Sequence, residues 1–213
     1  MLKQNKWKIL ISTLVILIPM LAGCLLWPQL PNTITTHWGV HNEANGFSSK
    51  AFTVFGMPSI MAALHLFCIV MTSADPKQKN IGKKPLGFVF WIIPTISLLV
   101  FSLIYANAMG AEVNVGFIIL LFMGVLFILI GNLLPKAKQN YSFGLKLPWA
   151  LNDSENWNRT HRFAGWCTVL SGVVTLLTAY WHNPWIFFGV LLFAVLAPVV
   201  YSYVIYKRKE KSA

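Results

Sequence analysis

The sequence predicts an all-α fold: a polytopic membrane helical bundle with six transmembrane helices. Of its 213 residues, 56% are hydrophobic and 11% are charged, whereas a soluble domain carries about 25% charged residues. The mean hydropathy is +0.63, so the chain needs a bilayer as its solvent. A helix crosses the hydrocarbon core, about 30 Å thick, with roughly 20 residues. Six apolar stretches reach that length: 8–27, 52–74, 86–108, 114–134, 163–182 and 185–206.

The distribution of charge predicts the orientation. Sixteen of the 17 Lys and Arg residues fall in one set of alternating segments, and Lys50 alone falls in the opposite set. Because basic residues gather on the cytoplasmic side, we expect N-in/C-in topology in the cell membrane, with 28–51, 109–113 and 182–184 outside. The net charge of +11 then suits membrane lipids with anionic headgroups and not direct nucleic-acid binding.

The first span ends in Leu21-Ala22-Gly23-Cys24, which imitates a bacterial lipoprotein signal. The apolar run continues through Trp27, whereas a lipidated protein usually begins with a polar tether, so a membrane span is the favoured interpretation. Lipidation of Cys24 stays open as the alternative. The three cysteines all fall in predicted spans, and their odd number argues against a disulfide framework. They are Cys24, Cys68 and Cys167.

The segment 28–51 predicts a compact outer cap between the first two spans. Residues 33–38 are rich in β-formers and predict a short strand, and Asn45-Gly46 predicts a turn. His37 and His41, four residues apart with Glu43 nearby, raise the question of a metal site. Gly39 argues against the helix that would place both imidazoles on one face. An ordinary polar loop is therefore favoured, and no metal is expected.

The second span contains His65, the clearest ionisable residue inside a predicted helix. Ionisable groups in a bilayer are costly and are candidates for function. No carboxylate lies in any predicted span to exchange a proton with it, so a neutral imidazole bonded to a neighbouring helix is favoured over a proton relay or ligand contact. No nucleophile or acid–base pair stands out elsewhere. We therefore expect no enzymatic activity and no cofactor.

The last two spans are separated by His182-Asn183-Pro184, which predicts a tight turn. Small residues in spans let helices approach closely. Four glycines are therefore predicted at helix–helix contacts: Gly124, Gly165, Gly172 and Gly189.

The polar segment 132–162 is expected to carry the partner-facing chemistry. If the fourth helix continues past Pro135, then Asn132, Lys136 and Asn140 share one helical face. Further on, Pro148 biases the preceding residue away from helix, and the tryptophan that follows it suits the membrane interface.

A second helix start is predicted at 152–155, where acidic and polar residues suit a helix N-terminus. It places Trp157, His161 and Arg162 on a short amphipathic helix that leads into the fifth span. Two interpretations stay open: an interfacial helix that anchors the bundle, and a docking surface for a ligand or protein.

The same segment resembles the signature of the SdpI family of bacterial membrane proteins. Lys146 departs from the arginine common in the family, which weakens bidentate binding of phosphate or carboxylate. The matching residues are Gly131, Asn132, Lys136, Asn140, Gly144, Leu145, Lys146, Pro148, Trp149, Trp157, Thr160, His161 and Arg162.

Towards the N-terminus, the chain resembles the small domain of unknown function DUF1648, which often precedes this signature. The residues that carry this likeness include His37, Trp38, Gly46 and Lys50. The two likenesses predict three parts. These are an N-terminal region 1–75 with two spans and the outer loop, a third span within 76–110, and an SdpI-like region 111–213 with a cytoplasmic motif loop 135–162.

The resemblance implies an immunity protein that protects the cell from a secreted membrane-active peptide toxin. It also implies a receptor that, on sensing the toxin, holds a cytoplasmic helix-turn-helix repressor at the membrane. The motif segment would then face the repressor, and the outer loop the toxin. A small membrane transporter or flippase-like protein stays open as the alternative. An intramembrane enzyme that uses His37, His41 or His65 is a third interpretation.

Overall fold

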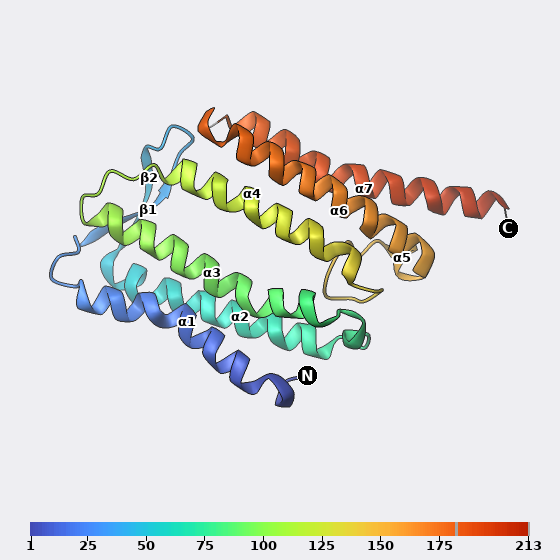
Figure 1. The fold of residues 1–213 in the computed structure, drawn as a ribbon. Coiled ribbons are helices and arrows are strands. Elements are labelled where there is room, and N and C mark those ends of the chain that lie inside the picture. Colours follow the sequence, from blue (N-terminus) through green and yellow to red (C-terminus); the bar gives the residue numbers. More distant parts are fainter. Residues whose placement is uncertain (182, 213) are drawn as a thin grey trace. The chain divides into compact units, whose positions relative to one another are not determined.

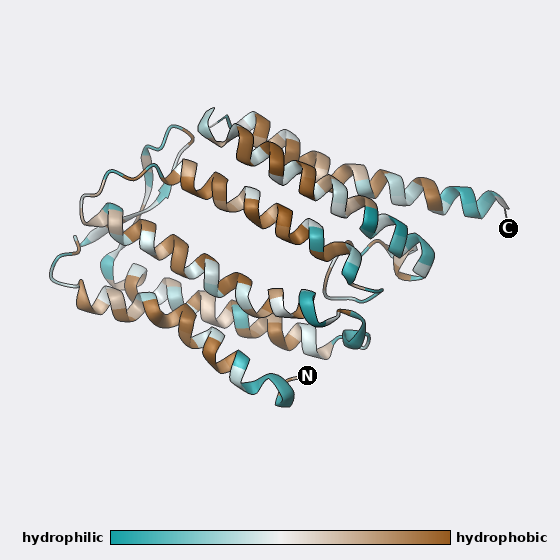
Figure 2. Ribbon diagram, viewed as in Figure 1, coloured by the Kyte–Doolittle hydropathy of each residue, from teal (hydrophilic) through white to brown (hydrophobic). Residues whose placement is uncertain are grey.

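The computed structural model describes residues 1–181 and 183–212 (Figure 1). Among these residues, six helices are long and apolar enough to cross a membrane, which confirms the predicted all-α multi-pass fold. Apolar residues run along the bodies of these helices, and hydrophilic residues gather near their ends (Figure 2). The six helices are α1 (Lys6–Leu25), α2 (Met57–Ala74), α3 (Lys83–Ala108), α4 (Val115–Leu133), α6 (Ser154–Thr178) and α7 (Pro184–Ser212).

Shorter elements lie between the spanning helices. A two-stranded antiparallel hairpin of β1 (Thr33–Trp38) and β2 (Ala44–Ser49) follows α1. The predicted strand is therefore confirmed, and its partner strand is an addition to the all-α prediction. The turn predicted at Asn45-Gly46 is wrong, because both residues lie within β2. A single π-helical turn, Phe52–Gly56, leads into α2. A four-residue helix, α5 (Pro148–Leu151), precedes α6.

The chain forms two compact units that are each discontinuous in sequence. The first comprises Met1–Ser73 and Gly87–Gly116, and the second comprises Ala74–Leu86 and Phe117–Ala213. The first unit therefore holds α1, the hairpin, α2 and most of α3. The second holds the loop between α2 and α3 together with α4 to α7.

Polar side chains tie the helices of the first unit together. The hydroxyl of Ser97 donates to the Ile16 carbonyl at 3.1 Å, and that of Tyr105 donates to the Pro19 carbonyl at 2.9 Å. His65 Nε2 lies 2.8 Å from Ser12 Oγ, and both residues are fully buried. The predicted bond from His65 to a neighbouring helix is therefore confirmed. Within a bilayer such polar groups must find partners in the protein.

The hairpin is fastened to the loop between α3 and α4 by its tip. Asn42, in the left-handed region with φ of 63°, accepts at Oδ1 from the backbone N–H groups of Val115 and Gly116, and its Nδ2 donates to the Val113 carbonyl. Asparagine tolerates a positive φ better than most residues do, so Asn42 suits this position at the tip. Gly46 lies opposite His37, and a Cβ there would come within 2.7 Å of the His37 Cβ.

Glycines allow α4 and α6 of the second unit to approach closely. A Cβ on Gly165 would come within 2.7 Å of the Gly131 carbonyl oxygen, and one on Gly172 within 2.6 Å of that of Gly124. The helix–helix contacts predicted for Gly124, Gly165 and Gly172 are confirmed. The contact predicted for Gly189 is wrong, because no atom of the described residues lies within 4 Å of a Cβ built there.

The polar segment differs from its prediction at two points. The helix α4 ends at Leu133 and gives way to a 3-10 turn, Leu134–Lys136, and then to a loop. Asn132, Lys136 and Asn140 therefore share no helical face, because Pro135 has no N–H to continue the helix. The helix predicted to begin near 152–155 does begin at Ser154, but it is the first part of the continuous α6 and not a separate short helix.

The three cysteines are free thiols, of which Cys167 is buried, Cys68 is half-buried and Cys24 is exposed. Cys24 lies in the last full turn of α1, which continues to Leu25.

Candidate functional site

The motif residues of the sequence meet in the second unit, around residues 137–147, which we call the motif loop. The loop has no regular secondary structure between the 3-10 turn after α4 and the start of α5. Backbone polar groups in such a segment need partners other than a helix or sheet. The side chains that supply these partners are largely those of the family signature.

Asn140 organises the centre of the motif loop. It is fully buried, and its Oδ1 accepts from the backbone N–H groups of Ser142 at 2.9 Å and Phe143 at 2.6 Å. Its Nδ2 donates to the carbonyls of Lys138 at 2.8 Å and Phe143 at 3.1 Å. An amide offers two donors and one acceptor oxygen with two lone pairs, so Asn140 has no capacity left for a ligand.

His161 and Trp157, on α6, hold the two ends of the motif loop. The Leu145 N–H donates to His161 Nε2 at 3.0 Å, and the Ala137 carbonyl accepts from Trp157 Nε1 at 3.0 Å. The two rings stack with centroids 3.9 Å apart and are almost fully buried. Because Nε2 accepts, the imidazole is neutral and its proton sits on Nδ1, which faces the Trp157 carbonyl at 2.9 Å.

Gly144 is required by this arrangement. Its φ is +105°, a conformation that favours glycine. A Cβ at this position would also overlap His161 Nε2. Glycine here lets the loop pass close enough to the imidazole for the next residue to donate its N–H to it.

Asp75, which the sequence did not single out, joins a second loop to the motif loop. Its carboxylate is buried and accepts from the Tyr141 N–H at 2.8 Å, the Ser142 hydroxyl at 2.8 Å and the Lys77 N–H at 2.7 Å. The Lys77 ammonium donates in turn to Gln139 Oε1 at 2.9 Å. One feature of the sequence could have indicated a role for Asp75: it is the one acidic residue in the segment 75–84, which contains four lysines.

Pro148 and Trp149 lie on a groove of about 610 Å³ beside the C-terminal part of α7, which we call the aromatic groove. Trp149 Nε1 donates to Ser202 Oγ at 3.0 Å, and its ring contacts those of Tyr203 and Tyr206 at centroid distances of 5.5 and 6.1 Å. The lining residues are Pro148, Trp149, Asn152, Asp153, Tyr206, Lys209 and Glu210.

Asp153 caps the N-terminus of α6 at the edge of the aromatic groove. Its side chain accepts from the backbone N–H groups of Glu155 and Asn156, and it pairs with Lys209 at 2.8 Å. Partial burial raises the pKa of Asp153, but the hydrogen bonds from Lys209 and from these two N–H groups outweigh it and hold the pKa below its ordinary value. The carboxylate is therefore ionised at neutral pH.

Four other motif residues are exposed: Asn132, Lys136, Lys146 and Arg162. Asn132 donates to the Ile128 carbonyl one turn earlier. Lys136, Lys146 and Arg162 point their charges outward, and none of them forms an ion pair within the described part of the chain. We call these three residues the basic surface. The site thus combines three features: a clamp formed by Asn140, Gly144, Trp157 and His161, whose polar side chains are buried, the exposed cations of the basic surface, and the aromatic groove.

The predicted outer-loop residues lie in the first unit, on or next to the hairpin. His37 Nδ1 bonds to Asn45 Oδ1, and Lys50 donates to the Trp27 carbonyl at 3.1 Å while lying over the Trp27 ring. The carboxylate of Glu43 accepts from the His41 backbone N–H. No three His, Cys, Asp or Glu residues group into a metal site in 1–181 or 183–212.

A polar cavity of about 450 Å³ lies beside the hairpin tip. It is lined by Asn42, Asn107, Gly110, Ala111, Glu112, Val113 and Asn114. Trp38, on β1, packs against the hydrophobic core of the first unit, whose buried members include Ile34 and Phe101.

Comparison with known proteins gives two family matches and one full-length relative. Residues 136–202 match the model of the SdpI/YfhL protein family, and residues 14–62 match the domain of unknown function DUF1648. The chain is 28% identical to the immunity protein SdpI of Bacillus subtilis (strain 168), over 96% of this chain and 99% of that protein. No solved structure matches. The residues Asn140, Gly144, Trp157 and His161 fall inside the first match, so the chain is similar to the SdpI/YfhL family in the segment that holds the motif loop.

Proposed function

We propose that this chain is an integral membrane immunity protein that protects its cell from a secreted membrane-active peptide toxin. The observation that carries the proposal is its end-to-end similarity to an immunity protein, which includes both the outer loop and the motif segment. The site chemistry agrees with a non-enzymatic role, because the buried polar groups of the clamp are used to hold the loop and not to meet a substrate.

On the outer side, the hairpin and its polar cavity are the proposed toxin-facing surface. The hairpin presents Phe47, which is 61% exposed, and the polar cavity lies at its tip. A membrane-active peptide combines apolar and polar faces, and an exposed aromatic and a polar cavity on one hairpin are complementary to both. This assignment depends on the orientation predicted from the charges.

On the inner side, the basic surface and the aromatic groove form the proposed docking site for a cytoplasmic helix-turn-helix repressor. The three cations of the basic surface are available because no acidic side chain of the described residues neutralises them. Exposed charges steer a complementary partner and speed its association. The clamp keeps the loop that bears Lys146 in one conformation, which lowers the ordering cost of binding.

A survival assay tests the immunity role. The chain is expressed in a toxin-sensitive Gram-positive host, which is then challenged with the purified peptide toxin. We expect survival above that of cells with an empty vector. The double variant Asn132→Ala/Arg162→Ala should lose protection, whereas Lys83→Ala/Lys84→Ala, two exposed lysines outside the motif, should keep it.

An absence of protection, with membrane expression verified, would make transport the leading function. Repressor docking is tested separately, by fractionating cells that contain the toxin and a tagged repressor. We expect Lys136→Ala/Lys146→Ala/Arg162→Ala to release the repressor from the membrane. If this triple variant retains both protection and the membrane-bound repressor, the docking assignment is wrong while the immunity role stands.

A further inference from the structure

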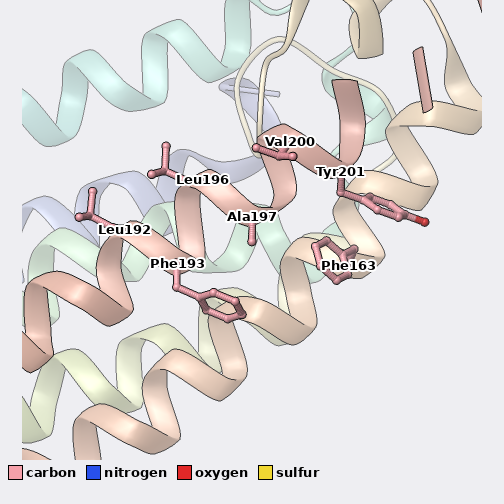
Figure 3. Close-up of a pocket in the computed structure, with 7 residues that line it drawn as sticks. All are labelled: Phe163, Leu192, Phe193, Leu196, Ala197, Val200 and Tyr201. Carbon is pink, nitrogen blue, oxygen red and sulfur yellow. The ribbon is translucent and has the colours of Figure 1, made fainter. Parts of the chain in front are cut away.

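An apolar groove runs along α7 where that helix faces Phe163 of α6. Figure 3 shows two rows of α7 side chains at its walls, with Phe193 and Tyr201 in one row and Leu192, Leu196 and Val200 in the other. Ala197 lies between Phe193 and Tyr201 in the first row, and we call the space over its small side chain the notch. The groove encloses about 510 Å³ and is lined almost entirely by apolar atoms.

The length of the groove fits one leaflet of a bilayer. Its lining residues on α7 run from Leu192 to Tyr201, which is about 14 Å at the helical rise of 1.5 Å per residue. That is close to half of the hydrocarbon core, which is about 30 Å thick. Both helices are among the spans of this membrane protein, so acyl chains are the medium that bathes the groove.

One end of the groove carries a cation and a hydroxyl. Arg159 lies one helical turn before Phe163 on the same face of α6, and its guanidinium interacts electrostatically with the hydroxyl of Tyr201. The rings of Phe163 and Tyr201 pack with centroids 4.6 Å apart and close this end. The polar pair therefore sits where the apolar groove meets the basic, predicted cytoplasmic, side of the membrane.

The charge of Arg159 is only partly countered. Its one ion-pair partner among the described residues is Glu155, at 3.4 Å, with both side chains more than half exposed. Glu155 is also held by Lys209, at the shorter distance of 2.7 Å. Guanidinium groups bind phosphate through paired N–H donors, so an anionic ligand at this point would meet an available cation.

We propose that this groove is a binding site for one anionic phospholipid, whose acyl chain lies in the notch at Ala197 and whose phosphate is bound by Arg159 and the Tyr201 hydroxyl. Phospholipid is the ligand class that combines a long apolar chain with a phosphate at its end. The match of an apolar groove one leaflet long to a cation at its end favours a phospholipid over a wholly apolar helix of a partner protein. This site is independent of the proposed immunity function.

The test is native mass spectrometry of the full chain, purified in mild detergent and titrated with dioleoyl-phosphatidylglycerol or dioleoyl-phosphatidylcholine. We expect one phosphatidylglycerol to be retained in preference to phosphatidylcholine. Arg159→Gln should lower the affinity for phosphatidylglycerol about tenfold, the size of effect typical of one hydrogen bond to a charged group. Arg162→Gln is the matched control, and it should leave binding unchanged.

Two further variants separate the acyl chain from the headgroup. Ala197→Phe fills the notch and should abolish retention of either lipid, and Tyr201→Phe keeps the ring but removes the hydroxyl and should weaken phosphatidylglycerol binding severalfold. Equal binding of both lipids, unaffected by Arg159→Gln and Tyr201→Phe, would show lipid of the surrounding annulus only and overturn the proposal. If Arg159→Gln and Arg162→Gln lower the affinity for phosphatidylglycerol equally, the proposal is also overturned. Such a result would indicate diffuse attraction of the lipid by the basic side of the protein.

Discussion

At the scale of single residues, the buried residues of the SdpI-like signature form a clamp that holds the motif loop, and they do not form a binding surface. Asn140, Trp157 and His161 are buried and use their polar groups to hold the motif loop. A buried polar group that loses its partner costs about 1–3 kcal/mol, so each of these side chains strongly favours the one loop conformation in which all are bonded. The exposed members of the signature, Lys136, Lys146 and Arg162, take no part in these bonds.

The position most sensitive to substitution is Gly144. A Gly144→Ala change places a methyl group against His161 in a backbone conformation that L-residues rarely adopt. We expect a loss of stability of about 1–3 kcal/mol, measured as a lower thermal midpoint in detergent, with faster proteolysis within the motif loop.

Two glycine controls separate the causes of that loss. Gly110 also has a positive φ, +88°, but no crowding, whereas Gly87 lies in α3 with no atom within 4 Å of a Cβ. Gly110→Ala should cost less than Gly144→Ala, and Gly87→Ala should be neutral or stabilising by up to about 1 kcal/mol. If all three variants behave alike, the contact with His161 is not what requires glycine at position 144.

Asp153 gives the N-terminus of α6 a dependence on pH. The pKa of this carboxyl is lowered in the folded protein, so its contribution to stability is fully present above its ordinary pKa of 3.8. The contribution is lost as the pH falls through the folded value. Thermal midpoints are measured between neutral pH and about pH 3. They should fall less steeply for Asp153→Asn, which can still cap the helix, than for the unsubstituted protein. Parallel curves for the two proteins would contradict this.

At the scale of elements, close packing of α4 on α6 holds the clamp in place. Gly131 and Gly165 allow the two backbones to touch just before α4 ends, and Pro135 packs against Gly165. The same helix α6 that supplies Trp157 and His161 is thus fixed to the helix from which the motif loop leaves.

Widening this contact should destabilise the second unit. Gly165→Leu would force α4 away from α6, and overpacking of this kind costs about 1–3 kcal/mol or more. Gly189→Leu, at an open position on α7, is the control and should have little effect. Stability is read from unfolding in detergent; an equal response of the two variants would mean that α4 and α6 do not pack in this way.

Hydropathy predicted the spanning helices, the β-forming residues predicted the first strand, and the acidic and polar residues at 152–155 predicted the start of α6. The end of α4 was not predicted, because a proline can either kink a helix or end it, and Pro135 ends this one. The sequence also predicted which residues make up the motif but not their burial. The buried role of Asp75 depends on a contact 66 residues away along the chain, to Tyr141, and a pattern of local spacings carries no information about it.

At the scale of the whole molecule, the proposed toxin-facing surface and the proposed docking surface belong to different units of the chain. The hairpin, with one lysine near it, belongs to the first unit. The clamp, the aromatic groove and the basic surface belong to the second, together with the loop that contains Asp75. A protein that meets a toxin on one side and signals on the other needs such a separation, provided that the two surfaces face opposite sides of the membrane.

The orientation is therefore the prediction on which the functional assignment depends, and cysteine labelling tests it. Cys24, Cys68 and Cys167 are first replaced by serine or alanine, and a single cysteine is then placed at one of two exposed positions, by Ala44→Cys in the hairpin or by Ser154→Cys at the start of α6. A membrane-impermeant maleimide should label the protein with Ala44→Cys in intact cells. It should label the protein with Ser154→Cys only after permeabilisation, because the basic segments remain on the cytoplasmic side. The opposite pattern would place the motif loop outside the cell, where no cytoplasmic repressor could reach the basic surface, and the motif segment would then become the toxin-facing one.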